Sequence, residues 1–397
     1  MTRFQRRMVI GLSVILLLLT GIGALAYKFY LSPTSYALQR AEAFLFRRMQ
    51  VVRLSHEGEY RFFFITNREL EKADGPLEDS FGTRRVDELK YGYFDVRIEP
   101  ALGLGMLINP TEWFQNEEIK LKAVRELDKE DFTEQLRTIV GTSPQRSLLV
   151  VVHGFREAFP SALRKTTFIS HVLDINSPVL LFDWPGNQGS SPSGYRRAQQ
   201  LAKESANDLA GSMELTIQNI RPERLWLIAN SMGAQVAVDA LRLLVGQTGP
   251  NEKQSKIEDV ILTAPDIDYD EFDEAFQAAL EALVQRTTIY VSSNDRALLA
   301  SRILNRTPRR GESTLDPRLS QTTLQVIDHD PNADRITIVD VTPVNRTRNF
   351  HNFSLETPEF FDDLFLRLTN TEIPHSRLIY PVEAPHGAIY WILTRGR

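Results

Sequence analysis

A serine stands between an apolar stretch and an amphipathic one in "RLWLIANSMGAQVAVDALRLL", which runs from Arg224 to Leu244. An abrupt turn from strand to helix exposes one side chain above the sheet, and it needs small neighbours because the backbone is crowded there. Ser231 is the predicted exposed residue, and Gly233 and Ala234 would let the helix begin directly beneath it. A serine held in this way can attack a carbonyl carbon as a nucleophile. The alternative is that Ser231 only caps the following helix, since serine is a favoured N-cap residue.

Such a nucleophile needs a histidine as its base and a carboxylate that orients the histidine. His351 follows the last predicted core strand and is the predicted base, with His386 as the alternative. Asp295, in "YVSSNDRALL", follows the second strand after the serine and is the predicted acid. Asp266, in "ILTAPDIDYDEF", follows the strand before that one and stays the alternative acid. The resulting chain order, serine then acid then histidine, is the order found with this kind of strand-to-helix turn.

The negative oxygen of a tetrahedral intermediate would also need backbone N–H donors. The segment "LLVVVHGFREAF" ends a predicted strand two strand-helix units before the serine. We expect the amides of Phe155 and Met232 to be the two donors of this oxyanion hole. The residues expected to line the substrate pocket around them are His153, Gly154, Asn230 and Trp184.

The elements that must position these residues alternate regularly after residue 146. Strands are expected at 147–155, 177–184, 224–231, 258–266, 287–295 and 335–344, and helices at 161–173, 195–220, 233–245, 271–285 and 297–304. Short strands that are apolar on both faces and separated by helices indicate a mostly parallel, doubly wound α/β sheet. Ligands bind such sheets at the carboxyl ends of the strands, where all the candidate residues fall. Residues 60–126 are also strand-rich, and a helix with an acidic first turn is expected at 128–140.

The N-terminus carries a different signal. An uncharged run from Met8 to Tyr27 follows Arg3, Arg6 and Arg7, and it is long enough to cross ~30 Å of hydrocarbon as a helix. The arginines predict a cytoplasmic N-terminus, with the remainder of the chain on the extracytoplasmic, periplasmic side. A cleaved signal peptide is the alternative, because Ala24–Ala26 resembles a cleavage site, and the protein would then be periplasmic or secreted.

Composition excludes several classes of function. The chain has 397 residues and a net charge of -5, so it lacks the broad positive field that a nucleic-acid partner would require. It contains no cysteine, which excludes disulfides, thiolate catalysis and cysteine-ligated metal centres. No metal and no cofactor is expected.

Taken together, these motifs resemble a family of α/β-hydrolases of unknown function that is found largely in bacteria. The matching segments, in order, are "FITNR", "YGYFDVRIEP", "VVVHGF", "LFDWPG", "LIANSMG", "LTAPDID", "YVSSNDRALLAS" and "FHNFSL". Asn230 stands where the family usually has a histidine, a difference that concerns substrate preference more than catalysis, whereas Ala229 agrees with the family.

The resemblance implies an α/β-hydrolase fold. With the predicted triad and the N-terminal apolar run, the sequence predicts a membrane-anchored serine hydrolase that cleaves small-molecule or lipid-like carboxylic esters. The alternatives are a non-catalytic binding or scaffold protein, and an amidase, peptidase or acyltransferase of the same fold. The expected organisation is an N-terminal anchor at 1–30, a helical stalk at 31–58 and a hydrolase domain at 59–397. Within that domain we expect a strand-rich part at 59–145, a catalytic core at 146–370 and a C-terminal extension at 371–397.

Overall fold

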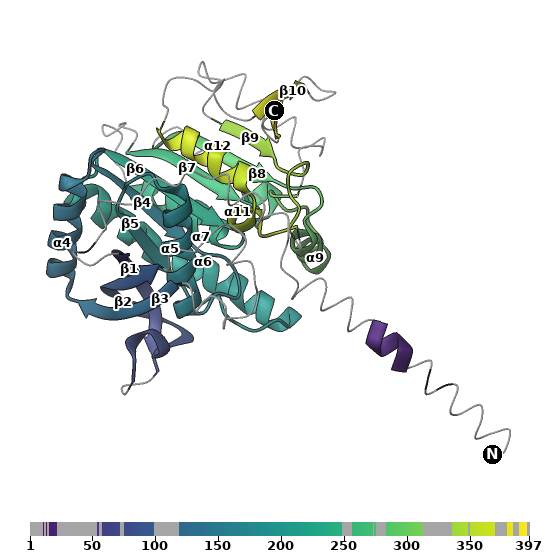
Figure 1. The fold of residues 1–397 in the computed structure, drawn as a ribbon, viewed down its shortest axis with the longest axis horizontal. Helices are drawn as coiled ribbons and strands as arrows, with labels where there is room; N and C mark the ends of the chain where they lie inside the picture. Colours follow the sequence, from purple (N-terminus) through teal and green to yellow (C-terminus); the bar gives the residue numbers. More distant parts are fainter. Residues whose placement is uncertain are drawn as a thin grey trace.

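One twisted sheet with helices on both of its faces dominates the computed structural model (Figure 1). The structure describes residues 11, 13, 16–21, 54, 58–71, 75–98, 119–247, 256–272, 274, 283–312, 336–347, 350–369, 379–383 and 389–394. The predicted stalk at 31–58 lies almost entirely outside these residues. The alternative base His386 lies outside them, and so does most of the helix expected at 271–285.

The sheet has eleven strands within the described residues, in the order β10-β11-β9-β8-β7-β6-β4-β5-β1-β2-β3. The strands are β1 Glu59–Leu70, β2 Phe81–Ile98, β3 Ile119–Leu127, β4 Ser147–Val152, β5 Val179–Asp183, β6 Arg224–Asn230, β7 Ile257–Thr263, β8 Val284–Val291, β9 Ile336–Asp340, β10 Ile379–Glu383 and β11 Ile389–Leu393. All neighbours from β11 across to β1 pair in parallel, and the pairs β1–β2, β2–β3 and β10–β11 are antiparallel. The mostly parallel sheet predicted from the sequence is therefore confirmed.

The strand-rich segment before residue 128 extends this same sheet. β1 pairs in parallel with β5 in the register Phe63 to Leu180 and Thr66 to Asp183. β2 and β3 then continue the sheet as an antiparallel edge. The strand-rich segment and the alternating strands that follow it thus form one sheet, and the polar end of β1 lies beside the polar end of β5.

The helices divide between the two faces of the sheet. They are α4 Lys129–Thr142, α5 Phe159–Leu173, α6 Pro192–Leu215, α7 Gly233–Gln247, α9 Arg296–Asn305, α11 Phe353–Glu356 and α12 Pro358–Thr369, together with the short 3-10 turn Leu77–Asp79 and a π turn at Thr216–Ile220. Apolar residues of α4, α6 and α7 pack into one core cluster, and those of α5, α11 and α12 pack into the other. The helix expected at 195–220 ends in that π turn, and Val284 and Gln285 belong to β8 rather than to a helix.

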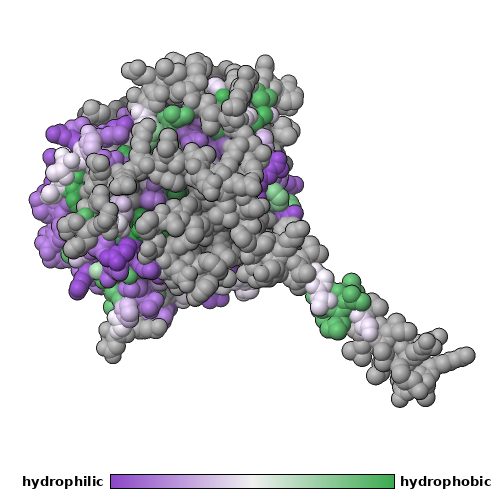
Figure 2. All heavy atoms as spheres, in the orientation of Figure 1, coloured by the Kyte–Doolittle hydropathy of each residue, from purple (hydrophilic) through white to green (hydrophobic). Residues whose placement is uncertain are grey.

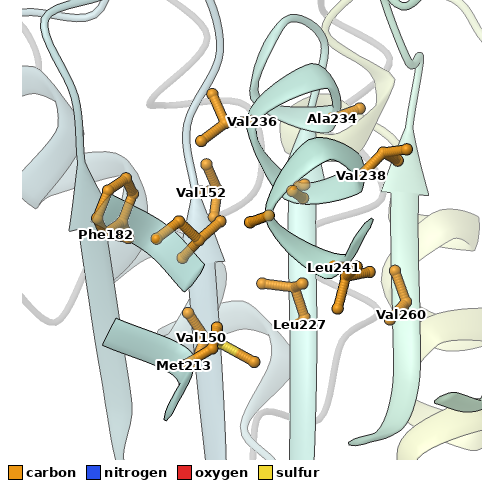
Figure 3. Packing of buried hydrophobic residues seen from close by; sticks show 14 of the residues in the cluster. Val150, Val152, Phe182, Met213, Leu227, Ala234, Val236, Val238, Leu241 and Val260 are labelled. Atoms are coloured by element: carbon orange, nitrogen blue, oxygen red, sulfur yellow. The ribbon is translucent and has the colours of Figure 1, made fainter. Parts of the chain in front are cut away.

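The central strands supply apolar side chains to both faces, as their sequences predict. Figure 3 shows Val150 and Val152 of β4 beside Leu227 of β6, packed under Val236 and Leu241 of α7. The alternate residues of β4, Leu149 and Val151, belong to the opposite cluster because successive side chains of a strand point to opposite faces. Burial of one such side chain stabilises the fold by about 1.5–3 kcal/mol. This packing fixes the carboxyl ends of the strands, where the candidate residues lie.

The N-terminal segment is described only at residues 11, 13 and 16–21, which are helical. Leu16, Leu17, Leu18 and Leu19 are between 60% and 73% exposed, and Figure 2 shows this described stretch as a strongly apolar patch. No helix among the described residues has the length and apolar character that crossing a bilayer requires. The greater part of the run from Met8 to Tyr27 lies outside those residues.

Candidate active site

Ser231 occupies a strained turn between β6 and α7. Its φ angle is 52°, in the left-handed region, which costs a residue other than glycine on the order of 1–3 kcal/mol. Three backbone hydrogen bonds hold the turn: Ser231 N donates to Thr263 O (2.9 Å), and Ser231 O accepts from Ala234 N and Asp266 N (both 3.0 Å). The serine side chain is thereby fixed above the carboxyl end of β6, as the sequence predicts.

Two glycines permit the close approach of the neighbouring strand to this turn. A Cβ atom on Gly154 would lie 3.0 Å from Ser231 Cβ, and one on Gly233 would lie 2.3 Å from His153 O. Side chains at these positions would push the end of β4 away from the start of α7. The "HGF" and "NSMG" segments therefore form one packed unit.

His351 connects the serine to Asp295. Its Nε2 lies 3.0 Å from Ser231 Oγ, and its Nδ1 lies 2.7 Å from Asp295 Oδ2. An ionised carboxylate only accepts hydrogen bonds, so Nδ1–H donates to Asp295 and Nε2 is left to accept the serine proton. The structure brings together the three residues that the sequence placed 56 and 120 positions apart.

Asp295 also serves as the N-cap of α9. Its Oδ1 accepts from Ala297 N (2.9 Å) and Leu298 N (3.0 Å), while Oδ2 faces the histidine. The side chain is fully buried. Both of its oxygens are therefore occupied, and the carboxylate cannot rotate away from His351 without losing the cap.

The surroundings of His351 favour its protonated form. Burial opposes protonation, but the charge of Asp295 and its hydrogen bond outweigh burial and raise the pKa of His351 above the ordinary value. Asp266 acts in the same direction and Lys165 in the opposite one. Asp295 therefore stabilises the imidazolium that forms during acyl transfer, and His351 accepts the serine proton more readily.

The alternative acid, Asp266, is engaged by other residues. Its carboxylate accepts from Tyr195 Oη (2.8 Å), Ser301 Oγ (2.6 Å) and Arg309 Nε (2.8 Å). Asp295, and not Asp266, is the carboxylate bonded to His351. The backbone N–H of Asp266 supports the serine turn, and its charge acts on His351 without a direct hydrogen bond.

A buried charge network that the sequence did not reveal lies behind the "HGF" segment. Arg68 and Asp183 are completely buried and paired, with Arg68 Nε 2.6 Å from Asp183 Oδ2. Arg68 also donates to the backbone oxygens of Glu157 (2.8 Å) and Trp184 (2.5 Å). Burial raises the pKa of Asp183, but the Arg68 charge and the His153 ring overcome it and hold that pKa below its ordinary value. The network thus ties the loop after β4 to the ends of β1 and β5.

Two of the expected pocket residues belong to this network. His153 lies 3.0 Å from Asp183 through Nε2 and 2.9 Å from Gly154 O through Nδ1, so it organises the loop. Trp184 was expected to line the pocket, but its side chain is fully buried and packs parallel to the His153 ring, with indole Nε1 donating to His153 O (2.9 Å). Trp184 belongs to the same core cluster as Phe182, two positions earlier, because the alternation of β5 continues past its end.

A buried amide joins the loops that carry the acid and the base. Asn345 Nδ2 donates to Ser292 Oγ (2.9 Å) in the loop before Asp295 and to Phe350 O (2.6 Å) directly before His351. The Asn345 side chain is completely buried. It therefore fixes the separation of the two loops, and its only sequence signal was its place in the polar stretch between β9 and His351.

The serine and the histidine of the triad line a cavity of about 610 Å³. His153, Gly154, Phe155 and Asn230 line it together with Ser231 and His351, whereas the Met232 side chain is buried in the core. Asn230 Nδ2 donates to Thr263 Oγ1 (2.9 Å) and Ser354 Oγ (3.1 Å). The role of the Phe155 and Met232 amides stays a prediction. Among the described residues, no group of three histidine, aspartate or glutamate side chains is arranged to hold a metal ion.

Residues 128–364 match the family described as "Alpha/beta hydrolase of unknown function (DUF900)". The chain belongs to this family of alpha/beta hydrolases. The resemblance inferred from the sequence motifs is thereby confirmed, and so are the α/β-hydrolase fold and the assignment as a hydrolase. The search of curated proteins found no match.

Three solved structures are similar to this alpha/beta hydrolase. A protein described as a cell surface hydrolase from Lactobacillus plantarum WCFS1 is 10% identical, with a TM-score of 0.35 over 58% of this chain and 94% of that chain. A hydrolase from Agrobacterium vitis S4 is 13% identical, with a TM-score of 0.31 over 69% and 97%. A lipase-esterase related protein from Clostridium acetobutylicum ATCC 824 is 14% identical, with a TM-score of 0.22 over 58% and 90%.

Proposed function

We propose that this protein is a serine hydrolase that cleaves carboxylic esters through an acyl-enzyme intermediate. The observation that carries the proposal is the continuous hydrogen-bonded chain from Ser231 Oγ through His351 to Asp295. The positive φ of the serine and the cavity in front of it support the same assignment, because a helix-capping serine requires neither.

The proposed reaction transfers an acyl group first to the serine and then to water. His351 Nε2 takes the Ser231 proton as the serine oxygen attacks the ester carbonyl, and Asp295 stabilises the imidazolium. The amides of Phe155 and Met232 would bind the oxyanion. His351 then returns the proton to the departing alkoxide, and water repeats the sequence on the acyl-enzyme. Loss of one oxyanion donor typically costs about 2.7–4 kcal/mol in the transition state.

The cavity suits a small-molecule or lipid-like acyl ester. Its apolar wall is formed by Ile169, Ile228, Leu304, Leu355, Phe360 and Leu364. An aliphatic chain buried there would contribute about 0.8 kcal/mol for each CH₂ group. We therefore propose that the acyl chain lies against this wall.

The N-terminal run from Met8 to Tyr27 is proposed to anchor the enzyme in the membrane, with the catalytic domain on the periplasmic side. The exposure of four consecutive leucines from Leu16 supports an apolar partner for this segment. The proposed organisation keeps the anchor at 1–30, the stalk at 31–58 and the hydrolase domain at 59–397. A chain that begins at residue 31 should remain soluble and active, and an insoluble or inactive product would contradict the separation of tether and enzyme.

Turnover of acyl esters, peptides and acceptor alcohols by the full chain in detergent tests the reaction type. The proposal predicts hydrolysis of 4-nitrophenyl butyrate, little cleavage of amides and little transfer to alcohols. Ser231→Ala should remove ester hydrolysis and leave the free energy of unfolding within about 1 kcal/mol of wild type. Full ester turnover by Ser231→Ala would contradict the proposal, and so would amide cleavage faster than ester cleavage.

A further inference from the structure

The cavity carries one cation whose charge the described part of the protein does not balance. Arg156 lines the cavity, and its side chain is exposed. Among the described residues, no carboxylate lies within ion-pair distance of its guanidinium. Arg156 therefore differs from every other basic residue of the wall.

The other charged side chains of the wall already have partners within the protein. Lys165 binds Glu157 on the same wall, and Ser161 Oγ donates to the other oxygen of Glu157 (2.7 Å). Asp266 is paired with Arg309 at 2.8 Å. Glu356, the remaining carboxylate of the wall, lies on α11 and accepts from Asn352 Nδ2 (3.5 Å). These arrangements leave the Arg156 guanidinium available to a molecule in the cavity.

The backbone holds Arg156 in a conformation that favours glycine. Its φ angle is 70°, and its N–H donates to Gly186 O (2.9 Å). A non-glycine residue in this region carries strain on the order of 1–3 kcal/mol, and such strain concentrates at functional sites. An arginine thus occupies a position where glycine would satisfy the turn with less strain.

Arg156 also stands directly beside the expected reaction centre. Phe155, whose amide is proposed to bind the oxyanion, is the preceding residue, and consecutive Cα atoms are about 3.8 Å apart. A guanidinium binds carboxylate and phosphate groups through two parallel N–H donors. Arg156 and Ser231 line the same cavity, so an anion that the guanidinium contacts there would belong to the molecule that the serine attacks.

We infer that Arg156 binds an anionic group of the substrate, so that the preferred substrates are acyl esters bearing a phosphate or carboxylate. This inference rests on the proposed ester hydrolysis and names its substrate class. The apolar wall would take the aliphatic part of the molecule and Arg156 the charged part. Arg156 contacts the substrate and determines specificity, and the acyl-transfer steps themselves do not require it.

Two matched substrate pairs test the inference with the full chain in neutral detergent. The first pair is 1-hexanoyl-glycerol and its 3-phosphate, with the anion on the alcohol side. The second is 4-nitrophenyl hexanoate and mono-4-nitrophenyl adipate, with the anion on the acyl side. The variants are Arg156→Gln, Arg156→Lys, and Arg156→Gly, which removes the charge while suiting the positive φ. Arg197→Gln is the control, because Arg197 is exposed on α6 and does not line the cavity.

Arg156→Gln and Arg156→Gly should lower kcat/KM about tenfold for the anionic member of at least one pair, the size expected for one charge-assisted hydrogen bond. Hydrolysis of the neutral members should be unchanged, and Arg156→Lys should retain most of the preference. The pair that responds shows on which side of the ester the anion lies. An equal loss on neutral and anionic substrates would overturn the inference, as would a preference that persists without the arginine. A wild-type enzyme that hydrolyses only the neutral esters overturns the inference alone, whereas one that hydrolyses none of the four overturns the proposed function as well.

Discussion

Replacing Asp295 by asparagine separates the two tasks of this carboxylate. In the structure, Oδ1 caps α9 and Oδ2 accepts from His351 Nδ1 at 2.7 Å. An asparagine can keep its oxygen on the cap and place its NH₂ group against the histidine. The ring must then accept at Nδ1 and carry its proton on Nε2, where it can no longer accept the serine proton. The variant should therefore lose catalysis and keep its fold.

The expected loss in kcat is about 10⁴-fold, the size seen when an orienting aspartate is replaced by asparagine in a triad of this type. At 1.36 kcal/mol for each factor of ten, this corresponds to about 5.4 kcal/mol in the activation barrier. The free energy of unfolding should change by no more than about 1 kcal/mol, because the helix cap is retained.

Asp266→Asn is the matched control, and it should have the opposite profile. Its side chain and that of Arg309 are 5% and 3% exposed, and breaking a buried ion pair from one side typically costs about 3–5 kcal/mol of stability. Its kcat per folded molecule should remain within about tenfold of wild type. The assay is ester hydrolysis together with denaturant unfolding of both variants. The reasoning is refuted if Asp295→Asn keeps more than a tenth of the wild-type kcat, or if Asp266→Asn loses as much as Asp295→Asn.

Three further perturbations test other parts of the site. Because His351 must be neutral to act as a base and its pKa is raised, kcat/KM should fall as the pH drops through a value above about 6.5, and a limb centred below 6 would contradict this assignment. Asn345→Ala should lower kcat about a hundredfold with KM little changed, because it releases the two loops from each other, whereas an unchanged kcat would remove its positioning role. Burial lowers the pKa of His171 to about 4, so the folded state should lose up to about 3 kcal/mol as the pH falls from 6.5 to 4. His171→Gln should flatten this dependence in denaturant unfolding, and identical curves for variant and wild type would contradict it.

Features that depend on a short stretch of neighbouring residues could be predicted from the sequence. The strands from Ser147 onward and the corner at Ser231 depend on short apolar runs and adjacent small residues, so their positions could be inferred before the structure was known. The chain order of serine, acid and histidine placed all three at strand ends, and the parallel sheet brings those ends to one edge.

Side-chain contacts between segments far apart in the chain could not be predicted from the sequence. Arg68 meets Asp183 across 115 positions, and Asn345 meets Ser292 across 53, with no pattern in the chain that relates them. Trp184 was misplaced for a different reason. Adjacency to a strand end suggested the pocket, whereas the two-residue alternation from Phe182 directs the indole into the core.

The central claim is that Ser231 is the activated nucleophile among several serines that face the cavity. Treatment of the full chain with a fluorophosphonate, followed by peptide mapping of the adduct by mass spectrometry, measures this directly. The account predicts a single adduct on the peptide that contains Ser231, formed much more slowly in His351→Ala and absent in Ser231→Ala. An adduct on Ser161, Ser301 or Ser354 instead, or no adduct on the folded wild-type protein, would contradict it.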